Sequence, residues 1–267
     1  MRWEGMARSE AIENAGWIGR RLHPFSAHDV GSVIPTGFAA YVRILHPAGR
    51  GSGPQPIEVR WSEVARWSGK VIHPLVQFHA LVPSPPRPEW GQEPFIYAPR
   101  DGVLAEAQVR TLAALLSTYT TTKDRCWYCL WDGFGYFSEG GYAEFRAYEN
   151  SLGGRWARWR HEHLNVRFRR PRRARISAAR VTPNPDRSYF LFTGSVMQAA
   201  GWEDGPNLWW PDDRAWCVAS EIDLAYTYVG GSRKLIDQIL ELPALESLPC
   251  EITDRVTYDS DTINTST

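Results

Sequence analysis

The chain has 267 residues, of which 43% are hydrophobic, and this composition excludes a disordered or fibrous protein. Thirty basic residues balance thirty acidic ones, so the total charge gives no argument for a polyanionic partner. Four cysteines are too few for a disulfide scaffold and fit reduced thiols. No apolar run has the length of a membrane span, and the first twenty residues lack the apolar core of a secretory signal, so we expect a cytoplasmic protein without membrane contact.

The first third of the chain predicts short strands and one short helix. Residues with β-branched and aromatic side chains occupy 38–45 and 57–61, and the Gly, Ser and Pro residues between these segments predict a hairpin with a long loop. Ser62 can cap a helix that ends at Gly69. The segment 76–82 predicts a third short strand.

Proline is concentrated in one segment, because six of the seventeen residues of 83–99 are proline. Proline fixes an extended backbone and lacks a backbone donor, so we interpret 83–99 as a linker or surface loop. A docking peptide for an aromatic groove is the less favoured alternative. Asp101 then begins the clearest helix of the chain. Its buried stripe has the spacing i, i+3, i+4, i+7 and consists of Val109, Leu112, Ala113 and Leu116.

The middle of the chain contains an apolar strand and then an arginine-rich stretch. CWYCLW at 126–131 predicts a strand that turns at Asp132-Gly133 into a hairpin with 134–137. Ten arginines and one acid occur from residue 155 to residue 180, whereas thirteen acids and four basic residues occur from residue 203 to residue 267. The neutral total therefore hides a chain that is polarised along its length. An arginine-rich insertion over 139–180 is one interpretation of this stretch.

The last third predicts strands over 189–193 and 215–222, and then a helix capped by Ser232 that ends before Pro243. The inward face of that helix consists of Leu235, Ile236, Ile239 and Leu240. Strands and helices do not alternate regularly. We therefore predict a single α+β domain over 1–267, with a mixed or mostly antiparallel sheet and a few short helices.

No metal or cofactor site is predicted. Cys126 and Cys129 have the spacing of a zinc or redox pair, but on a strand they point to opposite faces, which favours buried core thiols. Proline follows His23, His46 and His73, and these residues are more typical of turns at strand ends than of a shared metal site. Phosphate-loop, dinucleotide-binding and nucleophile-elbow signatures are absent, so the sequence favours a protein that is not an enzyme.

The arginine-rich stretch offers one possible surface for an anionic partner. Arginines can contact phosphates while interleaved tryptophans stack on bases, a combination that is typical of single-stranded nucleic-acid binding. The candidate residues are Trp156, Arg158, Trp159, Arg169, Arg170, Arg172 and Arg173. A structural role, or docking on the acidic last third of the chain, is the favoured alternative.

The segment 207–223 is the strongest candidate for a binding surface. Two adjacent tryptophans precede a proline and two acids, and two more acids follow the predicted strand. Such a group can bind a sugar or a cation, and a carboxylate pair can perform acid–base chemistry. The candidate ligand-binding residues are Trp209, Trp210, Asp212, Asp213, Arg214, Glu221 and Asp223. The favoured interpretation of the segment itself is an aromatic strand packed in the core, with 212–214 as a solvated turn.

Several segments carry a resemblance. The sequence NLWWPDDRAWCVASEID at 207–223, and VTYDSDTIN near the end of the chain, resemble a family of uncharacterised actinobacterial proteins. The resemblance implies a folded bacterial cytoplasmic protein and carries over no activity. We therefore expect a non-catalytic binding or protein-interaction protein that uses the aromatic and acidic segment, with a protein as the possible partner. The alternatives are a hydrolase with a carboxylate site in 209–223 and a nucleic-acid binder that uses 155–180.

Overall fold

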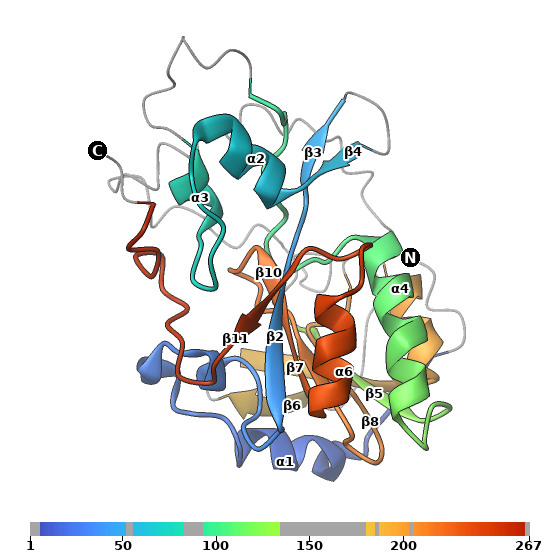
Figure 1. The fold of residues 1–267 in the computed structure, drawn as a ribbon. Coiled ribbons are helices and arrows are strands. Elements are labelled where there is room, and N and C mark those ends of the chain that lie inside the picture. Colours follow the sequence, from blue (N-terminus) through green and yellow to red (C-terminus); the bar gives the residue numbers. More distant parts are fainter. Residues whose placement is uncertain are drawn as a thin grey trace.

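The computed structural model describes residues 6–51, 56–82, 93–133, 180–184, 187–202 and 205–264. The fold class is α+β, as predicted, and its main element is a nine-stranded sheet (Figure 1). The strands are β1 (Ala7–Arg8), β2 (Ala40–Leu45), β5 (Cys126–Trp131), β6 (Arg180–Asn184), β7 (Arg187–Gly194), β8 (Leu208–Pro211), β9 (Cys217–Ala219), β10 (Tyr226–Gly231) and β11 (Ser247–Cys250).

The strand order of the large sheet is β1-β7-β5-β8-β9-β10-β2-β11, and β6 also pairs with β7. The pairs are antiparallel throughout. A second sheet consists of β3 (Ala48–Arg50) and β4 (Ile57–Val59). The α-helices are α1 (Gly16–Gly19), α2 (Trp61–Ser68), α3 (Phe78–Leu81), α4 (Glu106–Leu116) and α6 (Arg233–Leu240). The 3-10 helices are Ile12–Ala15, Phe25–Ala27, Val30–Ser32, Ser117–Tyr119 and Val196–Gly201.

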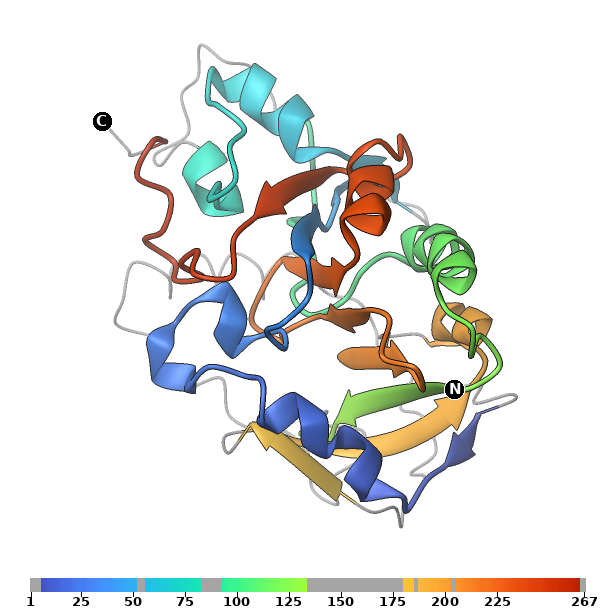
Figure 2. The same ribbon diagram turned by 60° about the horizontal axis from the view of Figure 1, so that its bottom comes forward.

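The sheet is buried on both faces. Helices α4 and α6 cover one face, and the N-terminal segment with α1 covers the other (Figure 2). Strand β5 shows how the sequence achieves this, because Cys126 and Tyr128 belong to the core under α4 and α6, whereas Trp127 and Cys129 belong to the opposite core. Successive side chains of a strand point to opposite faces, so a continuous apolar run such as CWYCLW suits a strand covered on both sides.

Two of the predicted elements are wrong. Segments 38–45 and 57–61 do not form a hairpin, because β4 pairs with β3 while β2 lies between β10 and β11. The segment 76–82 contains helix α3 and no strand. A side chain supplies hydrogen bonds to the backbone at the start of this segment, since the Arg43 guanidinium donates to the carbonyls of Pro74 and Val76. These two carbonyls therefore have hydrogen-bond donors without a neighbouring β-strand.

The helix ends agree with the sequence in part. Gly69 adopts the left-handed conformation after α2, as predicted, but Ser62 does not cap that helix. The carboxylate of Glu246 accepts from the backbone N–H groups of Trp61 and Ser62 instead. Ser232 caps α6 through a hydrogen bond from the backbone N–H of Leu235, which confirms that prediction. Helix α4 begins at residue 106 and not at 101, because a glycine with a φ of +70° interrupts the chain at position 102.

Parts of the predicted organisation lie outside the described residues. These are 134–137 of the expected hairpin, 83–92 of the expected linker and all of the expected insertion 139–180 except Arg180. The described end of the linker is built into the fold, since Phe95 is buried and Tyr97 pairs with Gly49. The single-domain interpretation stays a prediction. In the described part of the chain, the helices lack the combination of length and apolar character that a bilayer crossing needs.

Candidate functional site

Trp209 and Trp210 are core residues. Their exposed fractions are 2% and 1%, so the expectation that this pair forms an exposed aromatic surface is wrong. Strand β8 lies between β5 and β9, and both faces of the sheet are covered, so neither indole reaches solvent. Trp209 contacts Trp216 edge to face at 5.2 Å, and Trp210 contacts Trp17 at 6.1 Å.

The acidic residues of the predicted site lie at two ends of the sheet. Asp212 and Asp213 occupy the turn between β8 and β9, whereas Glu221 and Asp223 follow β9 at its other end. The Asp212 carboxylate accepts from the indole Nε1 of Trp127 at 2.9 Å. It also forms an ion pair with Arg125.

The Asp213 carboxylate holds its turn together. It accepts from the hydroxyls of Thr120 and Thr121 and from the backbone N–H groups of Thr121 and Ala215. These hydrogen bonds favour the ionised form, so they outweigh the desolvation of the carboxyl and lower the pKa of Asp213 below its ordinary value. Both acids at this end are therefore bound within the protein.

Glu221 and Asp223 converge on Arg187, which begins β7. The guanidinium Nη2 lies 3.0 Å from Glu221 Oε1 and 2.9 Å from Asp223 Oδ2, and Nε donates to Glu221 at 3.2 Å. Burial raises the pKa of Glu221, and the charge of Arg187 opposes that effect. Asp223 is mostly exposed.

Two aromatic rings lie close to the same guanidinium. The Arg187 Cζ atom lies 5.9 Å from the ring centroid of Phe25 and 5.9 Å from that of Trp131. Phe25 is partly exposed in the 3-10 helix 25–27, and Trp131 ends β5. We call Phe25, Trp131, Arg187, Glu221 and Asp223 the Arg187 cluster.

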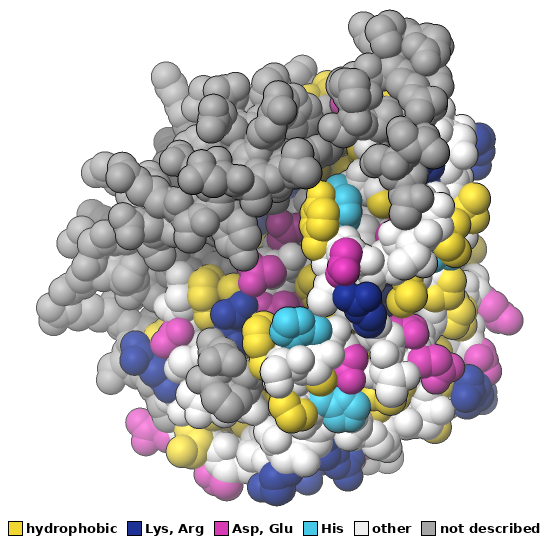
Figure 3. All heavy atoms as spheres, turned by 90° about the vertical axis from the view of Figure 1, so that its left-hand side faces the viewer, with side chains coloured by type: hydrophobic (Ala, Val, Ile, Leu, Met, Phe, Trp, Pro, Cys, Tyr) yellow, Lys and Arg dark blue, Asp and Glu magenta, His cyan; other side chains and the backbone are white. Residues whose placement is uncertain are grey.

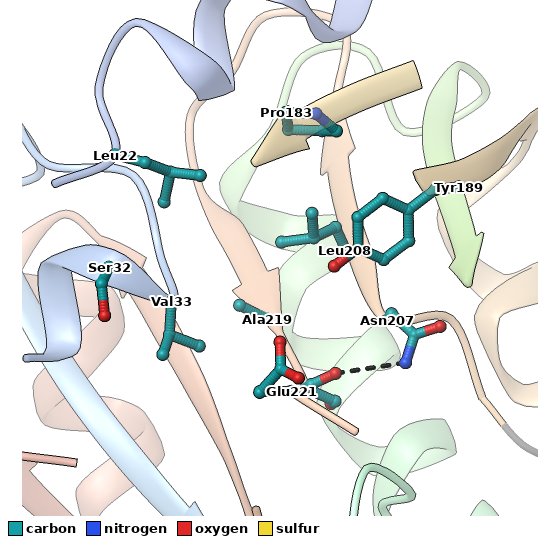
Figure 4. Close-up of a pocket in the computed structure, with 10 residues that line it drawn as sticks. Leu22, Ser32, Val33, Pro183, Tyr189, Asn207, Leu208, Ala219 and Glu221 are labelled. Atoms are coloured by element: carbon teal, nitrogen blue, oxygen red, sulfur yellow. Dashed lines mark hydrogen bonds between the residues drawn. The ribbon is translucent and has the colours of Figure 1, made fainter. Parts of the chain in front are cut away.

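A small cavity lies beside the Arg187 cluster (Figure 4). Its walls include Tyr189 and Glu221, which point toward one another, and Asn207, whose amide donates to the backbone carbonyl of Ser220 at 3.2 Å. Burial raises the pKa of the Tyr189 hydroxyl, and the nearby Glu221 carboxylate adds to this effect. The cavity has room for about one water molecule, which is too little for an organic substrate.

The described residues bring Glu221 and Asp223 together on Arg187, but only Glu221 lines the cavity, so the two carboxylates do not face one enclosed position as the hydrolase alternative requires. Glu221 lines the cavity, Asp223 faces solvent, and the other two acids lie beyond the opposite end of β9. A general acid–base pair needs two carboxyl groups that face one substrate position. This geometry gives no support to that alternative.

No pattern in the sequence predicts Arg187, Tyr189 and Phe25 as parts of a site. Arg187 and Glu221 are 34 positions apart and meet only because the sheet places the start of β7 near the end of β9. Phe25 approaches from the N-terminal segment on the same face of the sheet. A local pattern in the sequence carries no signal for such a meeting.

The other sequence motifs have structural roles. Cys126 and Cys129 point to opposite faces of β5, as predicted, and both thiols are buried. The three histidines that precede proline lie apart. His23 pairs with Asp29, His46 with Thr227 and His73 with Asp261. Within the described residues, no group of three His, Cys, Asp or Glu side chains could hold a metal ion.

The predicted site for an anionic partner falls outside the described residues. It consists of Trp156, Arg158, Trp159, Arg169, Arg170, Arg172 and Arg173. On the face shown in Figure 3, the described acidic, basic, histidine and hydrophobic side chains are intermixed. The described part of that face therefore has no basic stripe of the kind that tracks a phosphate backbone.

Comparison with protein-family models, curated proteins and solved structures gave no match to this chain. The resemblance to an actinobacterial family therefore stays a prediction.

Proposed function

We propose that this chain is a non-catalytic binding protein that contacts a protein partner through the Arg187 cluster. The observation that carries the proposal is that the Arg187 guanidinium lies 5.9 Å from the ring centroids of both Trp131 and the exposed Phe25. Arginine and large aromatic residues dominate the energetics of protein interfaces, because they combine a large contact area with directional hydrogen bonds.

The cluster is held in place before any partner binds. Two carboxylates fix the guanidinium, and the backbone N–H of Gly102 donates to the carbonyl of Leu224 beside them. An ordered surface loses less side-chain entropy on binding. This supports a binding role without a conformational change of these side chains.

The charge of the cluster indicates the chemistry of the partner. Two carboxylates face one guanidinium, so the cluster has an excess of negative charge. The Asp223 carboxylate is mostly exposed, and a lysine or arginine of the partner can reach it. We therefore expect the partner to place a basic side chain beside Asp223 and an apolar one on Phe25.

The test is quantitative affinity purification of the tagged full-length protein from its own organism. Phe25→Ala and Asp223→Lys are compared with two controls, Ile57→Ala and Asp237→Lys, which change exposed residues of β4 and α6. We expect at least one protein to be enriched with the wild type and both controls and lost with both cluster variants. Equal recovery with all five proteins, or equal loss with the controls, overturns the proposal.

A further inference from the structure

The indole of Trp17 carries two guanidinium groups. The Cζ atom of Arg21 lies 5.6 Å from the Trp17 ring centroid, and that of Arg214 lies 5.5 Å from it. Trp17 itself is 3% exposed, whereas both arginines are exposed residues. Because both Cζ atoms lie close to one ring, the two cations cannot be farther apart than twice the longer of these distances.

Neither arginine has an acidic partner within ion-pair distance among the described residues. The two acids nearest in sequence to Arg214 are already occupied, since Asp212 binds Arg125 and Trp127 and Asp213 binds two threonines. A guanidinium that stacks on an aromatic face leaves its N–H edge available for hydrogen bonds. Two exposed guanidinium groups therefore share one indole, and neither has an acidic partner among the described residues.

The backbone holds Arg214 in a conformation that is unfavourable for an L-residue. Its φ is +55°, in the left-handed region, where a side chain other than that of glycine is strained. The hydrogen bonds of Asp213 to Thr121 and to the backbone N–H of Ala215 stabilise this turn. The result is that the Arg214 side chain lies against Trp17.

Arg21 is also held in position. Its carbonyl accepts from both the backbone N–H and the hydroxyl of Thr36. Gly37, with a φ of +96°, lies beside the guanidinium, and a Cβ atom built there would lie 3.5 Å from Arg21 Nη1. The absence of a side chain at position 37 leaves the N–H edge of Arg21 accessible.

We propose that Arg21 and Arg214 form a binding site for the anionic group of a ligand, a phosphate or a carboxylate. Each guanidinium can donate charge-assisted hydrogen bonds to such a group, and binding relieves the repulsion between the two cations. The site lies between α1 and the β8–β9 turn, at the end of β9 opposite to the Arg187 cluster. It is therefore separate from the proposed protein-binding surface.

The experiment is an NMR titration of the full-length, 15N-labelled protein with inorganic phosphate at constant ionic strength, followed at the assigned indole N–H of Trp17. We expect a saturable shift, and we expect Arg21→Gln and Arg214→Gln each to weaken the apparent affinity at least tenfold. Arg66→Gln, which removes an exposed arginine of α2, is the matched control and is expected to bind like the wild type. The proposal is overturned if the shift does not saturate, or if both arginine variants bind phosphate with the affinity of the wild type.

A second titration with acetate identifies the chemistry. Tighter binding of phosphate indicates a phosphorylated ligand, and tighter binding of acetate indicates a carboxylate; either result supports an anion site. Arg214→Gly protects the test against misfolding, because it relieves the positive φ while it removes the guanidinium. We expect this variant to keep the dispersion of the wild-type spectrum and to lose phosphate binding. Retention of wild-type affinity in a folded Arg214→Gly protein contradicts the assignment of Arg214.

Discussion

The guanidinium of Arg187 donates to Glu221 through both Nε and Nη2, so this pair is joined by two hydrogen bonds. Replacing Arg187 by Met leaves the Glu221 and Asp223 carboxylates beside one another without a counter-charge. We expect Arg187→Met to lower the free energy of unfolding by about 2–3 kcal/mol, below the usual cost for a fully buried pair because Asp223 is exposed. Urea denaturation measures this loss.

Glu221→Gln is expected to cost about 1 kcal/mol or less, because it also removes a carboxylate that is expensive to bury. The double variant Arg187→Met, Glu221→Gln should therefore be more stable than Arg187→Met alone. If the two single losses simply add in the double variant, the ion pair does not couple these residues.

The buried imidazole of His46 predicts a loss of stability in mild acid. Desolvation lowers the pKa of His46 to about 4, and the charges of Arg100 and Arg43 act in the same direction. Below pH 6.5 His46 is protonated in the unfolded chain but stays neutral in the folded chain. The free energy of unfolding therefore falls between pH 6.5 and about 4. The full loss is about 3 kcal/mol for such a shift.

Urea denaturation of the wild type and His46→Gln at pH 7 and pH 4 checks this expectation. The variant should lose about 3 kcal/mol less than the wild type between the two pH values. His79, with a pKa also lowered to about 4 by burial, adds a smaller loss in the same direction to both proteins. The pKa of Asp213 is lowered, so its contribution to stability also begins to fall near pH 4, but this loss is common to both proteins and cancels in the comparison. An identical pH dependence in the two proteins contradicts the role of His46.

Alanine substitutions at two glycines with positive φ distinguish the cost of backbone strain from the cost of a steric clash. Gly69 and Gly102 have φ values of +68° and +70°, but a Cβ at position 69 meets open space, whereas one at position 102 lies 2.8 Å from the Cα of Ile222. We expect Gly69→Ala to cost about 1 kcal/mol and Gly102→Ala about 1 kcal/mol or more beyond that. Thermal denaturation measures both. Equal costs would show that the Ile222 segment moves away freely.

Trp209→Ala distinguishes a core residue from a ligand-binding one. Loss of a buried tryptophan costs about 3–5 kcal/mol, because a large cavity remains. Trp67 is only half-buried, so Trp67→Ala serves as the matched control and is expected to cost less. Urea denaturation of the two variants gives the comparison, and a small loss for Trp209→Ala would contradict its place in the core.

Elements that depend on local physics could be predicted from the sequence. The strand 126–131 follows from its apolar run, and the cap of α6 follows from one hydroxyl. β10 ends in two glycines that are typical of a turn, and β11 contains Pro249, which is tolerated because β11 is an edge strand. Strands β10 and β11 gain their stability from the strands beside them, and the local sequence does not reveal those neighbours.

The same reason limits the prediction of sites. Trp209 and Asp212 are close in sequence, yet one is buried in a core and the other lies in a turn at the end of its strand. Arg187 meets Glu221 only through the order of the strands. The segment 207–223 therefore shows where acidic and aromatic residues occur along the chain, but it does not show which of their side chains meet in the folded protein.

The position of β2 in the sheet has a consequence for biosynthesis. This strand carries the run AYVRIL, and both of its neighbours, β10 and β11, come from residues 226–250. A ribosome releases the chain from its N-terminus onward, so β2 emerges long before either neighbour exists. The large sheet can be completed only after almost all of the described chain has been translated. Stalled or truncated chains therefore present an unpaired apolar strand, and we expect them to be bound by chaperones or degraded.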